Sequence, residues 1–195
     1  MRLRLECLAV CLLPLIGGHA FAQSNVSPGE ILQSLTGASG AAQAVAIDVN
    51  AIRSDIEQRI KVEGTENAAS PPPVLQALAT LPNLTLVIEF DLDSDRIKPR
   101  SYKTVGYIAD ALHHPLLLSY KFVVVGHGDA SGSREHNLDL SQRRAAAVVE
   151  ALTTTFRVEP GQLVALGLGE EQLSDPSDPT GAVNRRVQLL NLGPR

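Results

Sequence analysis

The fold of this chain is decided by the stretch FVVVGHGDASGSREHNLDLSQRRAAAVV, residues 122–149. It begins with a continuous apolar run, residues 122–125, which is typical of a strand that is covered on both faces or central in its sheet. A glycine-rich loop follows, and a long helix is then expected over residues 134–155. The side chains expected to form the buried stripe of that helix are Leu138, Ala145, Val149, Leu152 and Phe156.

The sequence on both sides of this stretch continues to alternate between strand and helix patterns. Residues 84–90 alternate as a strand does, and Pro99 opens a helix that is expected to end near residue 114. Two more strands are expected over residues 163–166 and 183–192, the last with Val183, Val187 and Leu189 on one face. The order β-α-β-α-β-β predicts an α+β fold over residues 74–195, a two-layer α/β sandwich. The right-handed crossover rule places both helices on one face.

The first 22 residues have the features of a secretory signal peptide. Arg2 and Arg4 precede an apolar run of about a dozen residues, which is shorter than the ~20 that a spanning helix needs. The run Ala20-Phe21-Ala22 then supplies a small-residue cleavage pattern. We therefore expect an exported, periplasmic protein that begins at Gln23. Both cysteines lie in the removed segment, so disulfides and zinc–thiolate sites are not expected.

Residues 23–73 are expected to form a helical N-terminal segment and a proline-rich linker. Ser27 and Glu30 form a capping box with Pro28 at the first helical position, and a second amphipathic helix is expected over residues 45–60. The three prolines of residues 71–73 favour an extended spacer, so the domain boundary is placed there and few contacts are expected across it. The second helix is interpreted either as a stalk or helix laid against the main domain, or as a docking helix for a partner.

Composition argues against nucleic-acid binding, because the chain has a net charge of −4 and no tryptophan. The loop of residues 126–132 resembles a dinucleotide fingerprint. However, its glycine spacing is one residue too long, and Asp129 would face the pyrophosphate.

Three further patterns bear on metal binding or catalysis. Asp91, Asp93 and Asp95 imitate the start of a calcium loop, but Arg96 and Tyr102 occupy the positions that need glycine and glutamate. The histidines lack helical metal-ligand spacing, and no Gly-x-Ser-x-Gly elbow frames a serine. We therefore predict no metal, no cofactor and no enzymatic activity.

The strongest functional signal spans residues 126–144. Asp129 follows the apolar strand, and Asn137 and Arg144 are seven residues apart, so they project from the same side of the helix with Ser141 between them. An acid, an amide and a guanidinium that converge in this way suit a small zwitterion with an ammonium and a carboxylate group. The other interpretation is a structural salt bridge between Asp129 and Arg144. Spacing alone leaves both interpretations open.

Several separated motifs occur in one order over residues 84–192. They are the loop 126–132 with Asn137, Leu140-Ser141 and Arg143-Arg144-Ala145; Gly167-Leu168-Gly169-Glu170; Asn184-Arg185-Arg186-Val187; and Phe90, Asp91, Ser94, Ile97 and Pro99. Together they resemble the OmpA-like C-terminal domain family, whose members include the peptidoglycan-associated lipoprotein and the flagellar stator subunit. The resemblance implies non-catalytic, non-covalent binding of peptidoglycan through the diaminopimelate of its stem peptide.

The same resemblance implies roles for individual residues. Asp129 and Arg144 fall on the family's two diaminopimelate positions, Asn137 matches its loop–helix asparagine, and Arg185 matches the first arginine of its Asn-Arg-Arg motif. Gly128 departs from the family, which usually has threonine there. No lipid anchor is expected, so attachment to the outer membrane would need an outer-membrane or envelope protein as a partner. The alternative function is a protein-interaction module that uses the helix of residues 45–60, with the domain as an anchor.

Overall fold

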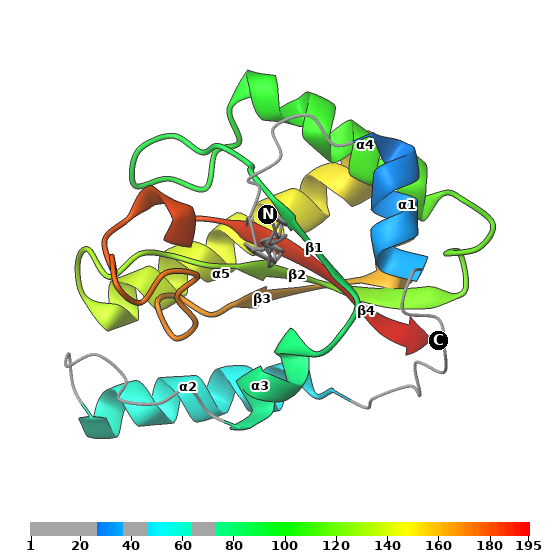
Figure 1. Ribbon diagram of the computed structural model, residues 1–195. Coiled ribbons are helices and arrows are strands. Elements are labelled where there is room, and N and C mark those ends of the chain that lie inside the picture. The colour runs from blue at the N-terminus through cyan, green and yellow to red at the C-terminus, as the bar shows by residue number, and fades with distance from the viewer. Residues whose placement is uncertain (1–26, 37–46, 64–72) are drawn as a thin grey trace, which may run out of the picture.

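A computed structural model describes residues 27–36, 47–63 and 73–195 of the chain (Figure 1). The predicted signal peptide, its cleavage site and most of the proline-rich linker lie outside these ranges. None of the helices within the described ranges combines the length and apolar character that a membrane span requires.

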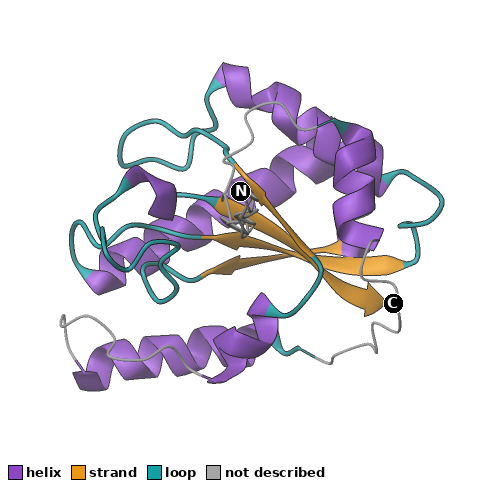
Figure 2. Cartoon of the chain, in the orientation of Figure 1, coloured by secondary structure: helices purple, strands orange, loops and turns teal. Residues whose placement is uncertain are grey.

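A four-stranded sheet forms the centre of the fold (Figure 2). Its strands are β1 (Asn83–Leu86), β2 (Tyr120–Gly126), β3 (Leu163–Gly167) and β4 (Val187–Pro194), in the spatial order β1-β4-β2-β3. Strands β2 and β3 are parallel, and the other two pairs are antiparallel. Helix α4 (Tyr102–Leu112) follows β1, and helix α5 (Arg134–Glu150) connects β2 to β3. The predicted β-α-β-α-β-β order is confirmed.

Strand β2 lies inside the sheet, and both of its faces are buried. Phe122 and Val124 pack in one apolar cluster with α4 and α5, whereas Val123 and Val125 pack in a second cluster on the opposite face. A strand that is covered on both faces cannot alternate apolar and polar residues. The continuous apolar run is explained by this position.

Two glycines let α5 lie very close to the sheet. A Cβ atom on Gly126 would lie 2.3 Å from the backbone oxygen of Ser141, and one on Gly167 would lie 2.3 Å from the backbone nitrogen of Gln142. Any larger residue at either position would push the helix away from the ends of β2 and β3. The close approach sets the N-terminal half of α5 beside the loop that follows β2. The helix ends in a π-helical turn, Ala151–Thr155, close to the predicted end.

The predicted capping box is present at the start of α1 (Pro28–Thr36). The Ser27 backbone nitrogen donates to Glu30 Oε2 at 2.8 Å, and the Glu30 backbone nitrogen donates to Ser27 Oγ at 3.3 Å. Ile31 and Leu35 of this helix are fully buried in the cluster that also contains α4 and α5. Asn191 Nδ2 of β4 donates to the Leu35 carbonyl at 3.1 Å, which ties the helix to the sheet.

Helix α2 (Val49–Glu63) and helix α3 (Pro73–Ala79) cover the opposite face of the sheet (Figure 1). Ile52 and Ile56 of α2 are buried in one cluster with Leu75 and Leu78 of α3 and with apolar residues of the strands. The expectation of few contacts between the N-terminal segment and the domain is therefore wrong, because both of its described helices supply core residues. These helices add a third layer to the predicted two.

Two predicted strands are shorter than expected. Val183 lies in a short 3-10 helix, Ala182–Asn184, and its side chain is 44% exposed, so it does not share a face with Val187 and Leu189. Beyond β1, Phe90 makes only an isolated bridge to Ile97. Leu86, the last residue of β1, pairs with Val187, the first residue of β4. The segment that follows β1 and the segment that precedes β4 therefore separate at this end of the sheet.

Candidate functional site

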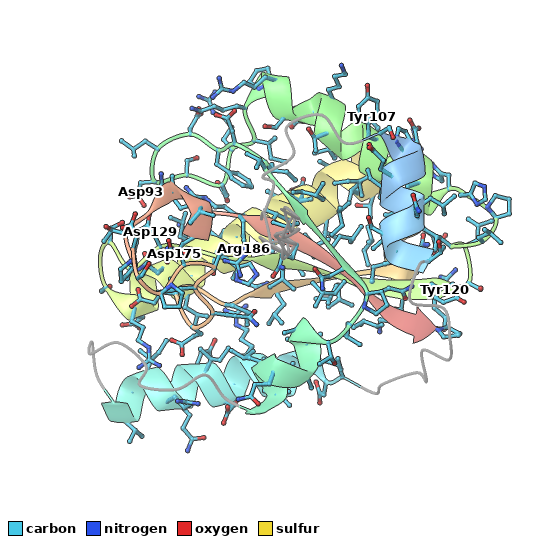
Figure 3. The ribbon with its side chains drawn as sticks, viewed as in Figure 1. Asp93, Tyr107, Tyr120, Asp129, Asp175 and Arg186 are labelled. Atoms are coloured by element: carbon cyan, nitrogen blue, oxygen red, sulfur yellow. The ribbon has the colours of Figure 1, made fainter. Side chains whose placement is uncertain are left out.

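The loops that follow β2 and β3 meet the chain that enters β4 at one end of the sheet. Figure 3 shows Asp93, Asp129 and Asp175 together at this end, with Tyr120 at the other. A cleft of about 490 Å³ opens here, and we call it the α5 cleft. Its lining residues are Phe90, Asp91, Leu92, Asp93, Gly128, Asp129, Ser131, His136, Asn137, Leu140, Ser141, Arg144 and Arg185. All four residues predicted for the ligand site thus line one cavity.

Asp129 is 5% exposed and is held in a tight network at the base of the cleft. Its Oδ1 accepts a hydrogen bond from the Ser131 backbone nitrogen at 3.0 Å and another from the Ser131 hydroxyl. Its Oδ2 accepts from Arg185 Nη1. Burial acts to raise the pKa of Asp129, but the hydrogen bonds from Ser131 and Arg185 outweigh it and hold the pKa below the ordinary value. Asp129 is therefore an anion at neutral pH.

Asn137 joins the loops on the two sides of the cleft. Its Nδ2 donates to the Asp129 carbonyl at 3.0 Å and to Glu170 Oε2 at 2.5 Å. Burial raises the pKa of Glu170, and the Asn137 amide opposes that rise. The asparagine Nδ2 carries two hydrogens, and these two bonds use both of them. The side chain therefore braces the loop after β2 against the loop after β3.

Arg144 points its guanidinium group toward the cleft without a carboxylate partner among the described residues. Its Nε donates to the Ser94 carbonyl at 2.9 Å, and its guanidinium carbon lies 5.1 Å from the centre of the Phe90 ring. Burial lowers the pKa of Arg144, but a guanidinium remains charged at neutral pH. The predicted alternative of an Asp129–Arg144 salt bridge is wrong, since Asp129 is paired with Arg185 instead.

Arg185 is positioned by its neighbour Asn184, whose side chain has no exposed surface. Asn184 Oδ1 accepts from the backbone nitrogens of Ser174 and Asp175, at 2.8 and 2.9 Å. Its Nδ2 donates to the Asp178 carbonyl at 2.8 Å. The sequence motif contains Asn184, but only the structure shows that it organises the loop before β4.

A buried ion pair at the start of α5 was not anticipated from the sequence. Arg134 Nε contacts Glu171 Oε1 at 2.5 Å and Nη2 contacts Oε2 at 2.8 Å, and each side chain is only 1% exposed. The pair fixes the first residue of α5 to the loop after β3, next to Glu170. An arginine at the start of a helix is usually exposed, so the apolar spacing of the helix did not indicate this contact.

The aspartates that imitate a calcium loop are engaged with basic side chains. Asp91 pairs with Arg96, and Asp93 Oδ1 lies 2.8 Å from His136 Nε2. In the described part of the chain, no three His, Cys, Asp or Glu side chains are grouped so as to hold a metal ion. The Asp93–His136 contact instead links the loop after Phe90 to α5 across the cleft.

Comparison with known proteins gives relatives for most of the chain. Outer membrane porin F of Pseudomonas aeruginosa is 36% identical over 115 residues, which cover 57% of this chain and 32% of that protein. The peptidoglycan-associated lipoprotein of Pseudomonas putida is 28% identical over 158 residues, which cover 80% of this chain and 86% of that protein. The chain thus spans about a third of the porin relative and most of the lipoprotein relative.

The fold and the family agree with these relatives. The periplasmic domain of Helicobacter pylori MotB superposes with a TM-score of 0.50 at 20% identity, covering 65% of this chain and 87% of that one, which shows a shared fold. The sequence pattern of the OmpA family matches residues 89–186, half of the chain, and this range includes every residue of the predicted ligand site. The chain therefore belongs to the OmpA family.

Proposed function

We propose that the protein binds peptidoglycan non-covalently in the periplasm and has no catalytic role. The bound group is the diaminopimelate of the stem peptide, held in the α5 cleft. One observation carries the proposal. Arg144 is fixed by the Ser94 carbonyl and the Phe90 ring. It brings a guanidinium with no carboxylate partner in the described part of the chain into the same cleft as the ionised Asp129.

The charges of the cleft complement the zwitterionic end of a diaminopimelate side chain. Arg144 would take the carboxylate through paired N–H groups, since Nε alone is used by Ser94. Asp129 would take the ammonium group, while the hydrogen bonds from Ser131 and Arg185 keep the Asp129 carboxylate ionised. Asn137 contributes by bracing both loops, because its amide hydrogens are already committed.

Two further observations support this proposal. The relatives of this chain include peptidoglycan-associated lipoproteins, and one of them aligns with 80% of this chain. The alternative of a docking helix at α2 has less support, because Ile52 and Ile56 are buried against the sheet and are not free for a partner. Periplasmic export through residues 1–22, and association with the outer membrane through an envelope partner, remain parts of the proposal.

The proposal is tested by co-sedimentation with purified sacculi that contain diaminopimelate. We expect Asp129→Asn and Arg144→Gln each to weaken binding about 10- to 100-fold, because each removes a charge-assisted hydrogen bond to the ligand. Arg143→Gln is the matched control, since Arg143 neighbours Arg144 but pairs with Asp139 on the helix surface. Thermal melts confirm that each variant is folded.

Competition gives a second, independent readout of the same site. Free diaminopimelate should release the protein from sacculi, whereas Nα-acetyl-lysine amide should not, because its side-chain end carries an ammonium group without a carboxylate. Release by both compounds would assign binding to non-specific charge. Wild-type sedimentation of both folded cleft variants would show that the wall is bound elsewhere.

Gly128→Thr tests the position where this chain departs from its family. A Cβ atom here would lie 3.7 Å from both Asn137 Cβ and the Gly169 backbone, which is ordinary van der Waals contact. We expect the unfolding free energy to rise by about 0.4–1 kcal/mol, because the unfolded chain loses conformational freedom. Gly128→Ala should give the same gain, so that any added affinity for sacculi in Gly128→Thr alone reports the hydroxyl. A lower melting temperature in both variants would show that the loop needs glycine.

A further inference from the structure

A second cavity lies beside the α5 cleft, where the segment that follows β1 separates from the chain that enters β4. We call it the arginine slit. It has a volume of about 310 Å³ and shares Phe90, Arg144 and Arg185 with the α5 cleft. Its remaining wall includes His127 and Arg186, which follow β2 and precede β4. The two cavities therefore adjoin across the Arg144 and Arg185 side chains.

The slit has more positive than negative charge. Within the described ranges, Arg186 donates to backbone carbonyls alone, from Nη2 to Gln172 at 3.0 Å and from Nη1 to Asn184 at 3.4 Å. Burial lowers the pKa of Arg186 to about 10, so it remains a cation at neutral pH. Among the described residues that line the slit, Glu89 is the one carboxylate, and it is paired with Arg100. Partly buried guanidinium groups without a carboxylate are costly, and an anionic ligand would relieve that cost.

His127 supplies an independent observation. Its side chain is 2% exposed, and neither ring nitrogen has a hydrogen-bond partner among the described residues. Burial, and then the charge of Arg186, lower the pKa of His127 well below its ordinary value. Gln188 and the Gln172 backbone oppose the shift, but they lie outside hydrogen-bond geometry. A neutral imidazole keeps one N–H donor, and a buried donor without an acceptor is unusual in a folded protein.

We propose that the arginine slit is an anion-binding subsite for a carboxylate or phosphate group. Arg144 and Arg186 supply the charge, and His127 supplies one N–H donor. On the cell wall the occupant would be a second carboxylate of the stem peptide whose diaminopimelate lies in the α5 cleft, and this part rests on the proposed function. The anion chemistry of the slit itself does not depend on it.

The test follows the imidazole resonances of His127 in the full chain without residues 1–22, by nuclear magnetic resonance, during titration with acetate and with inorganic phosphate. We expect a saturable shift of the His127 signals and a rise of its pKa, since a nearby anion favours the protonated ring. His113 and His114, which are more exposed and line neither cavity, are internal controls for general ionic-strength effects. A His127 that does not respond, or that responds only as the other histidines do, overturns the subsite.

Variants then locate the binding charge. Arg186→Gln should weaken anion binding about 10- to 100-fold, while Arg143→Gln, on the surface of α5, should leave it unchanged. Arg186→Lys keeps the charge but loses the paired N–H geometry, so an intermediate loss is expected if Arg186→Gln fails to fold. Equal affinity in wild type, Arg186→Lys and folded Arg186→Gln would contradict the proposal.

A soluble stem peptide separates this inference from the proposed function. If the peptide shifts His127 in the wild type but not in Asp129→Asn, both the cleft and the slit are occupied by the wall ligand. If acetate or phosphate shifts His127 and the peptide does not bind at all, the subsite stands and the proposed function fails. If the peptide binds while neither it nor the free anions move His127, the proposed function stands and the subsite is wrong.

Discussion

A chain that lacks residues 1–72 will melt at least about 10 °C below a chain that starts at Ser27. The deletion removes four side chains that are almost fully buried: Ile31 and Leu35 of α1, and Ile52 and Ile56 of α2. Burial of one such side chain stabilises a fold by about 1.5–3 kcal/mol, and each kcal/mol is worth about 2–4 °C in a chain of this size. Even after allowance for the entropy of ordering the two helices, a loss of several kcal/mol is expected.

The deletion also removes part of the cover from each face of the sheet, α1 from one face and α2 from the other. Without α2, the cluster that contains Leu75, Leu78 and Val125 faces water, so we expect the shortened chain to bind a hydrophobic dye and to self-associate. Differential scanning calorimetry and analytical ultracentrifugation of the two chains measure these effects. A cooperative, monomeric shortened chain with an unchanged melting temperature would show that the N-terminal helices are dispensable.

Point substitutions on one helix separate packing from chain length. Ile56→Ser should lower the unfolding free energy by about 2–5 kcal/mol, because Ile56 has no exposed surface. Val62→Ser on the same helix should change it by less than about 0.5 kcal/mol, since Val62 is 80% exposed. Similar behaviour of the two variants would contradict the packing of α2 on the sheet.

The order and type of the main elements were predictable because their signals are local. A continuous apolar run identified β2 as a strand with two buried faces, and helical spacing identified the stripe that includes Leu138 and Ala145, both buried in α5. The capping box at Ser27 fixed the start of α1 within one residue. Each of these signals depends on neighbours in sequence, and a single sequence can report those directly.

What the helices cover was not predictable in the same way. The apolar positions of α2 showed an amphipathic helix, but its partner is formed by α3 and by strands that come much later in the chain. The composition of the linker suggested separation, whereas the buried face of the helix required a surface. The apolar face of the helix was a better predictor of packing on the domain than the proline-rich linker was of separation.

In the candidate site, too, the position of each residue was predictable from the sequence, whereas its bonding partners were not. Helical spacing correctly set Asn137 and Arg144 on one side of α5, and the strand end correctly set Asp129 beside them. The spacing could not show that Asp129 pairs with Arg185, since that pairing depends on the loop organised by Asn184. It also could not show that the Asn137 amide is used up in joining two loops. The sequence identified which residues line the cleft, but only the fold shows which partner each of them bonds.

Arg134→Met is expected to lower the unfolding free energy by about 3–5 kcal/mol, because it leaves the Glu171 carboxylate buried without its partner. Arg134 is the largest of the fully buried side chains, and its two short contacts to Glu171 fix the start of α5. Urea denaturation measures the loss. A variant as stable as the wild type would show that the pair contributes nothing to the fold.

The double variant Arg134→Met/Glu171→Leu decides what the pair is for. Replacing both charges with apolar side chains removes the buried unpaired charge, so most of the lost stability should return. The loop that carries Glu171 also carries Glu170, which accepts from Asn137, so the charged pair can fix the cleft as well as the core.

Sedimentation of the double variant with sacculi separates these roles. Recovered stability with binding still reduced would assign the pair to positioning the loop, whereas recovery of both would make it a packing element that apolar residues can replace. A double variant as unstable as Arg134→Met alone would instead show that the desolvated charge of Glu171 is not the cause of the loss.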